Sequence, residues 1–144
     1  MKIGITGTRT GTTKEQYANL RLYLLMNERY ITEFHHGSCK GVDEEAHDLL
    51  AATKVSRHVW PSNNTSTRVD VPIRDLDFCH KVAQPLTRNR DIVNSVDLLI
   101  AFPKLMHEEQ RSGTWAAIRY ARKQELPVTI YWPDGSMTQE RRDG

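Results

Sequence analysis

The sequence predicts an α/β protein: a Rossmann-like three-layer sandwich with a mostly parallel sheet of about five strands. Short apolar runs alternate along the chain with stretches of helical periodicity, and this alternation implies right-handed crossovers between parallel strands. Two of the runs, DLLIAF at 97–102 and PVTIYW at 127–132, are almost continuously apolar. Strands that are buried on both faces have this pattern, so we expect helices on both faces of the sheet.

The first strand and the first helix are expected within residues 2–30. KIGIT at 2–6 is a strand that runs into a glycine-rich segment. Residues 13–30 form a helix, because Thr13 and Gln16 match a capping box. The apolar periodicity of this helix places on one face Tyr17, Leu20 and Leu24.

The second strand is expected at 31–36, where the sequence reads ITEFHH. The second helix follows at 43–53, with Asp43 as a natural N-cap. Its inward face is expected to carry Ala46, Leu49 and Leu50. A short third strand at 57–60 is stopped by Pro61.

The second half of the chain begins with a segment that has no clear periodicity. Residues 62–85 are polar and contain prolines, so no element is assigned there. Further helices and strands are expected at 86–95, 97–102, 112–124 and 127–132. We expect the tail, 134–144, to be solvated and partly disordered.

Length and composition indicate one domain, at 1–133, followed by the tail. The chain has 144 residues, of which 38% are hydrophobic and 26% charged, as in soluble globular proteins. No apolar run approaches the roughly 20 residues of a membrane span and no signal peptide is visible, so we expect a cytoplasmic protein without a membrane partner. The net charge of +2 gives no electrostatic case for a nucleic-acid partner. Cys39 and Cys79 are expected to be buried or idle thiols.

Three strand-to-helix loops place glycines, hydroxyls and basic residues directly before a helix. If the first strand is central, the loops after the first and fourth strands border the point of strand-order reversal, where such sheets bind ligands. One such loop is explained as a turn with a helix cap, whereas three at one edge indicate a phosphate-bearing ligand. The candidate ligand-binding residues in these loops are Gly7, Thr8, Arg9, Thr10, His36, Gly37, Ser38, Lys40, Gly41, Arg111, Ser112, Gly113 and Thr114.

With these loops in place, the chain resembles the SLOG superfamily of Rossmann-like nucleotide-binding proteins. That group includes the lonely-guy phosphoribohydrolases, the DNA-processing protein A fold and sensor domains for nucleotide-derived immune signals. The resemblance covers roughly residues 1–133 and is specific for the superfamily rather than for one activity. It rests on GITGTRTGT from Gly4, HHGSCKGVDEEAH from His35, PLTRNRDIVNSVDLLIAFPK from Pro85 and RSGTWAAIRYARK from Arg111.

The resemblance to the lonely-guy hydrolases is partial. Those enzymes carry an arginine ahead of the aspartate that opens the fourth strand, then Pro-Gly-Gly-x-Gly-Thr-x-x-Glu. Parts of this pattern are matched by Arg88, Asp97, Pro103, Gly113 and Thr114. Ala116 and Ala117 stand where the family has helix carboxylates, which would stabilise the ribosyl cation that forms as a glycosidic bond breaks. This departure counts against cytokinin-type hydrolysis.

Two further candidate sites remain open in the sequence. Arg88 either reaches the phosphate or ribose of the ligand, as the resemblance implies, or forms a surface pair with Asp91. Glu108 and Glu109 are candidate catalytic residues that could orient a ribose hydroxyl or act on an anomeric carbon, or they belong to a solvated loop.

The other acidic and histidine residues receive structural interpretations. Asp43 is explained as a cap, and Glu44 and Glu45 as first-turn residues that favour the helix dipole. The histidines match no known set of ligands, so we expect no metal and no cofactor, and His36 is expected to donate to the ligand. The histidines considered are His35, His36 and His47.

Two functions follow from these patterns. The first is a sensor or sequestering protein that binds a nucleotide or nucleotide-derived ligand, phosphoribosyl or ADP-ribose-like, without turning it over. The alternative is a nucleotide or nucleoside-phosphate N-glycosidase, with Glu108 or Glu109 as the carboxylate. A homodimer or larger homo-oligomer is expected, because the aromatic-rich TIYW strand could be covered at a subunit interface.

Overall fold

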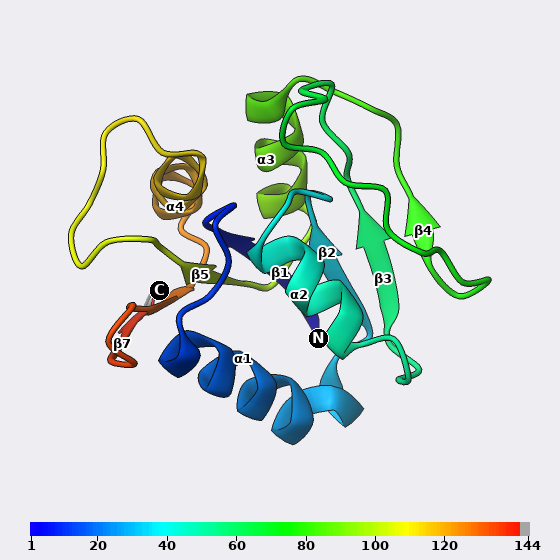
Figure 1. Ribbon diagram of the computed structural model, residues 1–144, viewed down its shortest axis with the longest axis horizontal. Helices are drawn as coiled ribbons and strands as arrows, with labels where there is room; N and C mark the ends of the chain where they lie inside the picture. The colour runs from blue at the N-terminus through cyan, green and yellow to red at the C-terminus, as the bar shows by residue number, and fades with distance from the viewer. Residues whose placement is uncertain (142–144) are drawn as a thin grey trace.

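The computed structural model describes residues 1–141, and within them seven strands form one sheet in the order β4-β3-β2-β1-β5-β6-β7 (Figure 1). The strands are β1 Lys2–Gly7, β2 Glu33–His36, β3 Ser56–Val59, β4 Phe78–Cys79, β5 Leu98–Phe102, β6 Val128–Tyr131 and β7 Met137–Glu140. The helices are α1 Lys14–Asn27, the short 3₁₀ helix η1 Glu28–Tyr30, α2 Val42–Leu49, α3 Pro85–Asn94 and α4 Gly113–Lys123.

The sheet is parallel except for its last pair. From β1 the chain proceeds outward through β2 and β3 to β4, returns to β5 on the other side of β1, and continues to β6. Strand order therefore reverses between β1 and β5. This confirms the predicted α/β, Rossmann-like class, although the sheet has more strands than the five expected. The first strand is central, which is the condition under which the loops after the first and fourth predicted strands border the reversal.

Helices cover both faces of the sheet, as expected for continuously apolar parallel strands. One face packs against α1 and α2, and its core includes Ile3, Ile5 and Phe34. The opposite face packs against α3 and α4, and its core includes Leu99 and Trp115. Figure 1 shows the two pairs of helices on opposite sides of the strands.

The predicted helix 13–30 is present as α1 followed by η1. Thr13 caps it, since its side chain accepts from the amide of Gln16 and the Gln16 side chain accepts from the amide of Thr13. The Gln16 Nε2 group donates to the carbonyls of Pro103 and Tyr131, and so ties the helix to the ends of β5 and β6. Leu20 and Leu24 are buried as predicted, but Tyr17 is exposed.

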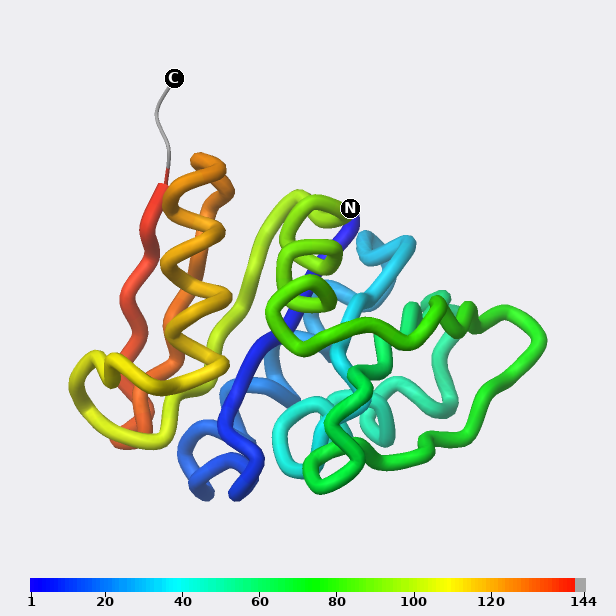
Figure 2. Tube along the Cα trace, turned by 90° about the horizontal axis from the view of Figure 1, so that it is seen from above, coloured from blue at the N-terminus to red at the C-terminus, as the bar shows by residue number. Residues whose placement is uncertain are grey.

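The segment without periodicity, 62–85, forms a long excursion that adds β4 to the edge of the sheet. It projects on the side of the molecule opposite β7 (Figure 2). The Asp77 side chain is fully buried and fixes this excursion, because it accepts from the guanidinium groups of Arg57 and Arg74. β4 could not be predicted from apolar periodicity, because the segment that contains it is held in place by the buried ion pairs of Asp77.

The predicted boundary between a domain at 1–133 and a tail at 134–144 places β7 outside the domain, and this part of the prediction is wrong. Residues 137–140 pair antiparallel with β6, although most of their side chains are exposed. The TIYW strand is therefore not an edge strand: β6 is buried and lies between β5 and β7. The disorder expected at the end of the tail falls on 142–144, outside the described residues.

Close packing of the end of β1 on α2 depends on a glycine. A Cβ atom at Gly7 would lie 2.5 Å from the Cβ of Val42, whereas one at Gly113 would meet no described atom within 4 Å. We expect Gly7→Ala to lower the free energy of unfolding by about 1–3 kcal/mol or more. Gly113→Ala, which adds the same methyl group, should leave stability unchanged or raise it by up to about 1 kcal/mol. Urea unfolding of both variants tests this; equal stabilities would contradict the packing argument.

No helix within residues 1–141 has the length and apolar character needed to cross a membrane.

Candidate functional site

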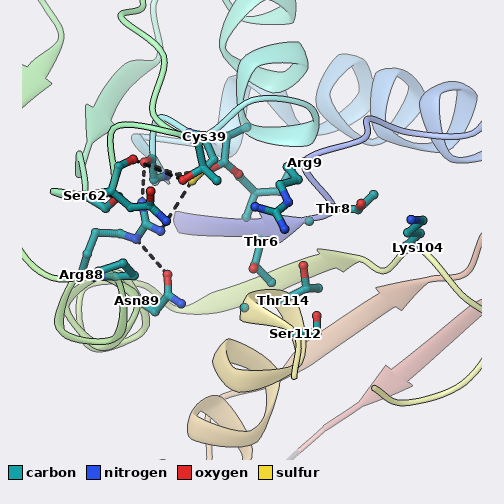
Figure 3. Close-up of a pocket in the computed structure, with 18 of the residues that line it drawn as sticks. Thr6, Thr8, Arg9, Cys39, Ser62, Arg88, Asn89, Lys104, Ser112 and Thr114 are labelled. Atoms are coloured by element: carbon teal, nitrogen blue, oxygen red, sulfur yellow. Dashed lines mark hydrogen bonds between the residues drawn. The ribbon is translucent and has the colours of Figure 1, made fainter. Parts of the chain in front are cut away.

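A cavity of about 400 Å³ opens at the carboxyl ends of β1 and β5, where the strand order reverses (Figure 3). Its walls come from the loops after β1, β2 and β5, from α3 and from the long excursion. Among the predicted ligand-binding residues, the cavity is lined by Gly7, Thr8, Arg9, Thr10, Gly37, Arg88, Arg111, Ser112, Gly113 and Thr114.

The N-terminus of α4 offers two backbone amides to the cavity. Ser112 caps the helix, since its hydroxyl accepts from the amide of Trp115 and its carbonyl from that of Ala116. The amides of Gly113 and Thr114 have no hydrogen-bond partner within residues 1–141. Gly113 is exposed, and the space around its Cα would accept a ligand. These two amides, with the partial positive charge of the helix end, favour an anion.

The loop after β1 contributes to the cavity mainly the hydroxyl groups of Thr8 and Thr10 and the guanidinium group of Arg9. The Thr8 hydroxyl pairs with that of Thr10 at 2.9 Å and also accepts from the Thr10 amide. The Thr12 amide and hydroxyl donate to the carboxylate of Glu45 at 2.8 and 2.7 Å, which anchors the loop on α2. Arg9 is exposed and lies beside the cavity with Thr6 (Figure 3). The exposed guanidinium is suited to forked hydrogen bonds with a phosphate.

In the loop after β2, the backbone amides that could bind a ligand are instead bound to a carboxylate of the protein, that of Asp43. Asp43 is not the N-cap of α2: Gly41 occupies that position and makes no side-chain cap bond. Instead, Oδ2 of Asp43 accepts from the amides of Gly37 and Cys39 at 3.0 and 3.3 Å. Its Oδ1 has no hydrogen-bond partner within residues 1–141, and the residue lines the cavity. Burial raises the pKa of the Asp43 carboxyl to about 6, although Arg88 and the two amides lower it.

Arg88, on α3, binds the backbone of the loop after β2. It is 7% exposed, and its guanidinium donates to the carbonyls of Gly37 and Trp60 and to the side chain of Asn89. Figure 3 shows the bond between Arg88 and Asn89 at one end of the cavity. A Cβ at Gly37 would collide with the guanidinium, so the glycine permits the contact. The alternative of an exposed Arg88–Asp91 surface pair is wrong, because the Arg88 side chain is buried.

Four predicted ligand-binding residues do not line the cavity. His36 is fully buried: its Nδ1 accepts from the Ser38 amide and its Nε2 bonds to Nδ1 of His47. Burial lowers the pKa of His36, so the ring is neutral and has no donor left for a ligand. Ser38 is buried and donates to the Val69 carbonyl. The other two residues outside the cavity lining are Lys40 and Gly41.

The two candidate catalytic glutamates differ in position. Glu108 is bound to Arg119 at 2.7 Å and does not line the cavity, so its carboxylate would not contact a guest there. Glu109 does line the cavity, close to Arg111 in the chain.

Several lining residues were missed by the sequence analysis. Lys104 follows β5 closely, and its place after a central strand was the available signal. Ser62, Asn64 and Thr67 come from the excursion after β3, whose polar composition resembles an ordinary loop. The further missed residues are Ile5, Thr6, Cys39, Asp43, Pro85, Asn89 and Ile92.

The charge of the lining favours an anionic guest. Arg9, Arg88, Lys104 and Arg111 supply four cationic groups, against the two carboxyl groups of Asp43 and Glu109. Arg88 is largely committed to Gly37 and Asp43, so the cations available to a ligand are the three remaining ones.

Comparison with solved structures identifies the fold. A molybdenum cofactor binding protein from Rippkaea orientalis superposes with a TM-score of 0.65 at 22% identity, over 91% of this chain and 76% of that one. DNA processing protein A from Helicobacter pylori gives 0.63 at 18% identity, over 90% and 64%. TM1055, a structural genomics target, gives 0.62 at 12% identity, over 88% and 71%.

This chain has the same Rossmann-like fold as these proteins. The resemblance seen in the sequence is therefore confirmed at the level of the fold. No protein-family model and no curated protein matches the chain. The Helicobacter protein binds single-stranded DNA, so the expectation that nucleic acid is not a partner draws no support from these neighbours.

Proposed function

We propose that this protein binds a nucleotide or nucleotide-derived ligand, phosphoribosyl or ADP-ribose-like, at the carboxyl edge of its sheet and acts as a sensor or a sequestering protein. The observation that carries the proposal is the cavity at the reversal point, where the unpartnered amides of Gly113 and Thr114 (within residues 1–141) lie beside exposed Arg9, Lys104 and Arg111. Amides at a helix end and exposed cations on the rim together favour phosphate.

The size and lining of the cavity fit a ligand with an apolar or sugar part as well as a phosphate. Its volume of about 400 Å³ lies within the roughly 300–1,000 Å³ of small-molecule sites. Ile5 and Ile92 form an apolar part of the wall, and Asn89 and Ser62 add polar groups. A nucleoside could use these polar and apolar groups while its phosphate lies at α4.

A thermal-shift screen tests the proposal. The panel contains nucleoside mono- and diphosphates, ADP-ribose derivatives, inorganic phosphate and a single-stranded oligonucleotide. A ligand present at 100 times its dissociation constant should stabilise the protein by about 2.7 kcal/mol. We expect a nucleotide-derived compound to raise the melting temperature more than inorganic phosphate does. A shift with the oligonucleotide alone would instead favour a nucleic-acid partner, and no shift with any compound would contradict the proposal.

The alternative function, N-glycoside hydrolysis, is favoured by one specific feature: Asp43. Its carboxyl group lines the cavity, has one oxygen without a partner within residues 1–141, and is held by two amides of the loop after β2. A carboxylate in this position could stabilise the ribosyl cation, which is the role that the sequence suggests for Glu108 or Glu109.

If the protein is a hydrolase, release of free base should depend on Asp43. The pKa of about 6 means that the carboxylate predominates above that pH, so the rate should rise from pH 5 to pH 7. Asp43→Asn should lower the rate by about 100-fold or more, while Glu108→Gln, outside the cavity, should not. Chromatography of the nucleotide incubations measures this. Base release that is unchanged in Asp43→Asn would remove Asp43 from the reaction, and no release by the wild type would leave the binding function alone.

The homo-oligomer stays a prediction. α1 presents the exposed apolar side chains Leu22, Leu25 and Met26, which support self-association better than the buried TIYW strand does. Light scattering coupled to size-exclusion chromatography measures the state directly.

A further inference from the structure

Three histidines meet on one face of the sheet, and none of them lines the cavity. His35 lies on β2, His58 on β3, and His80 directly follows β4. The register pairs His35 with His58, so the two rings stand side by side and stack with centroids 4.4 Å apart. Each of the three residues brings a ring nitrogen within 4.8 Å of the other two.

The hydrogen bonds define which nitrogens face one another. Nε2 of His35 lies 2.9 Å and Nε2 of His58 lies 3.7 Å from Oε1 of Glu33. The opposite nitrogen of each ring faces away from this carboxylate: Nδ1 of His58 lies 3.0 Å from Nε2 of His80, and Nδ1 of His35 accepts from the indole of Trp60. Glu33 therefore favours the tautomers that keep a hydrogen on Nε2 and a lone pair on Nδ1.

We propose that Nδ1 of His35, Nδ1 of His58 and Nε2 of His80 bind a divalent transition-metal ion such as Zn²⁺, with Glu33 orienting the first two rings. Three imidazoles are a ligand set suited to Zn²⁺, Cu²⁺ or Ni²⁺. Ligating histidines commonly donate their other N–H to a carboxylate, and Glu33 occupies that position. The metal replaces the proton shared between His58 and His80, and the Trp60 indole gives up its bond to His35.

The spacing is close to that of a bound ion. Two imidazole nitrogens at roughly 2.0–2.1 Å from one tetrahedral zinc ion lie about 3.3 Å apart. The 3.0 Å between Nδ1 of His58 and Nε2 of His80 is near this value, and a ring nitrogen of His35 lies within 4.8 Å of the nitrogens of both.

The surroundings hold the rings in place. Phe78 stacks on His58, and Trp60 stacks on His80 with centroids 3.4 Å apart. His35 is buried while His58 and His80 are partly exposed, so an ion can enter from solvent and keep a water molecule as a further ligand. The bound ion ties β2 and β3 to the end of β4, at the edge strand contributed by the long excursion. Sequence spacing carries no sign of this site, because His58 and His80 are separated by 22 residues and His35 is more distant still from His80.

Calorimetric titration of the metal-free protein with Zn²⁺ tests the site. We expect one ion per chain with a dissociation constant of about micromolar or tighter, weakened more than about tenfold in His80→Ala. His107→Ala removes an exposed histidine from a different loop and should leave the affinity unchanged. Glu33→Gln should weaken binding by about 10–100-fold. Equal affinities for His80→Ala and His107→Ala, or no binding to the wild type, would overturn the proposal.

A second measurement does not depend on any variant being folded. Cobalt bound to the wild type should give visible d–d absorption bands of a four- or five-coordinate ion, lost on addition of one equivalent of Zn²⁺. A spectrum identical to that of hexaaquo cobalt would contradict the site. Since this experiment needs no nucleotide, its result is independent of the function proposed for the cavity.

Discussion

Glutamate in place of Gly113 is expected to lower the affinity for a phosphate-bearing ligand by at least about 100-fold, or about 2.8 kcal/mol. The new side chain brings a carboxylate to the point where the amides of Gly113 and Thr114 are unpartnered within residues 1–141. It both fills the space and occupies the positive end of α4 with a charge of the wrong sign for the ligand. The ligand used is the compound that gives the largest shift in the thermal screen, and affinity is measured by calorimetry.

Two variants separate this effect from a general loss of structure or a change in net charge. Gly113→Ala adds only a methyl group where no described atom lies within 4 Å, and should retain most of the affinity. Lys14→Glu places a carboxylate in the first turn of α1, which does not line the cavity, and should bind like the wild type. If Gly113→Glu is folded and retains wild-type affinity, the phosphate is bound elsewhere.

Replacement of Asp77 by asparagine is expected to lower the free energy of unfolding by about 3–5 kcal/mol. The Asp77 side chain has no exposed surface and accepts from Arg57 and Arg74, with its shortest bond, 2.6 Å, to Arg57. The Arg57 side chain is only 2% exposed, so the substitution leaves a buried cation without its counter-charge. Asp75→Asn, two residues away on the exposed surface, is the matched control and should change stability by less than about 0.5 kcal/mol.

The same ion pairs predict how stability depends on pH. The two guanidinium groups hold the pKa of the Asp77 carboxyl far below its usual range, against the opposing effect of burial. A lowered pKa means that the folded state keeps the carboxylate while the unfolded state takes up the proton, so this contribution is lost as the pH falls below about 4. Acidification from pH 6 to pH 3 should therefore destabilise the wild type more than Asp77→Asn. Parallel curves for the two proteins would show that Asp77 does not titrate in this way.

The helices and central strands could be predicted because their causes are local. The capping box of Thr13 and Gln16, the continuous apolar runs of β5 and β6, and the Ser112 cap are all contained in a few adjacent residues. Taking the first strand as central was enough to place the point of strand-order reversal beside the loops that follow the first and fourth predicted strands. This was enough to place the cavity and most of its predicted lining.

The remaining features depend on residues that are distant in the sequence. Asp43 stands where a helix cap is expected, yet its carboxylate accepts from the amides of the preceding loop. His36 ends the strand β2, where a ligand donor was expected, yet its Nε2 is already hydrogen-bonded to His47 on α2. β7 has no apolar alternation, because most of its side chains are exposed and it is held by backbone pairing with β6. None of these contacts produces a pattern among neighbouring residues of the sequence, so none could be predicted from it.

A crystal structure of the protein with the compound that stabilises it most would show whether the cavity at the reversal point binds a phosphate-bearing ligand. We expect the phosphate to lie within hydrogen-bonding distance of the amides of Gly113 and Thr114, with Arg9 closing over it and the sugar directed toward Asp43 and Asn89. A ligand bound on another face of the protein, with only water in this cavity, would contradict the proposed binding site.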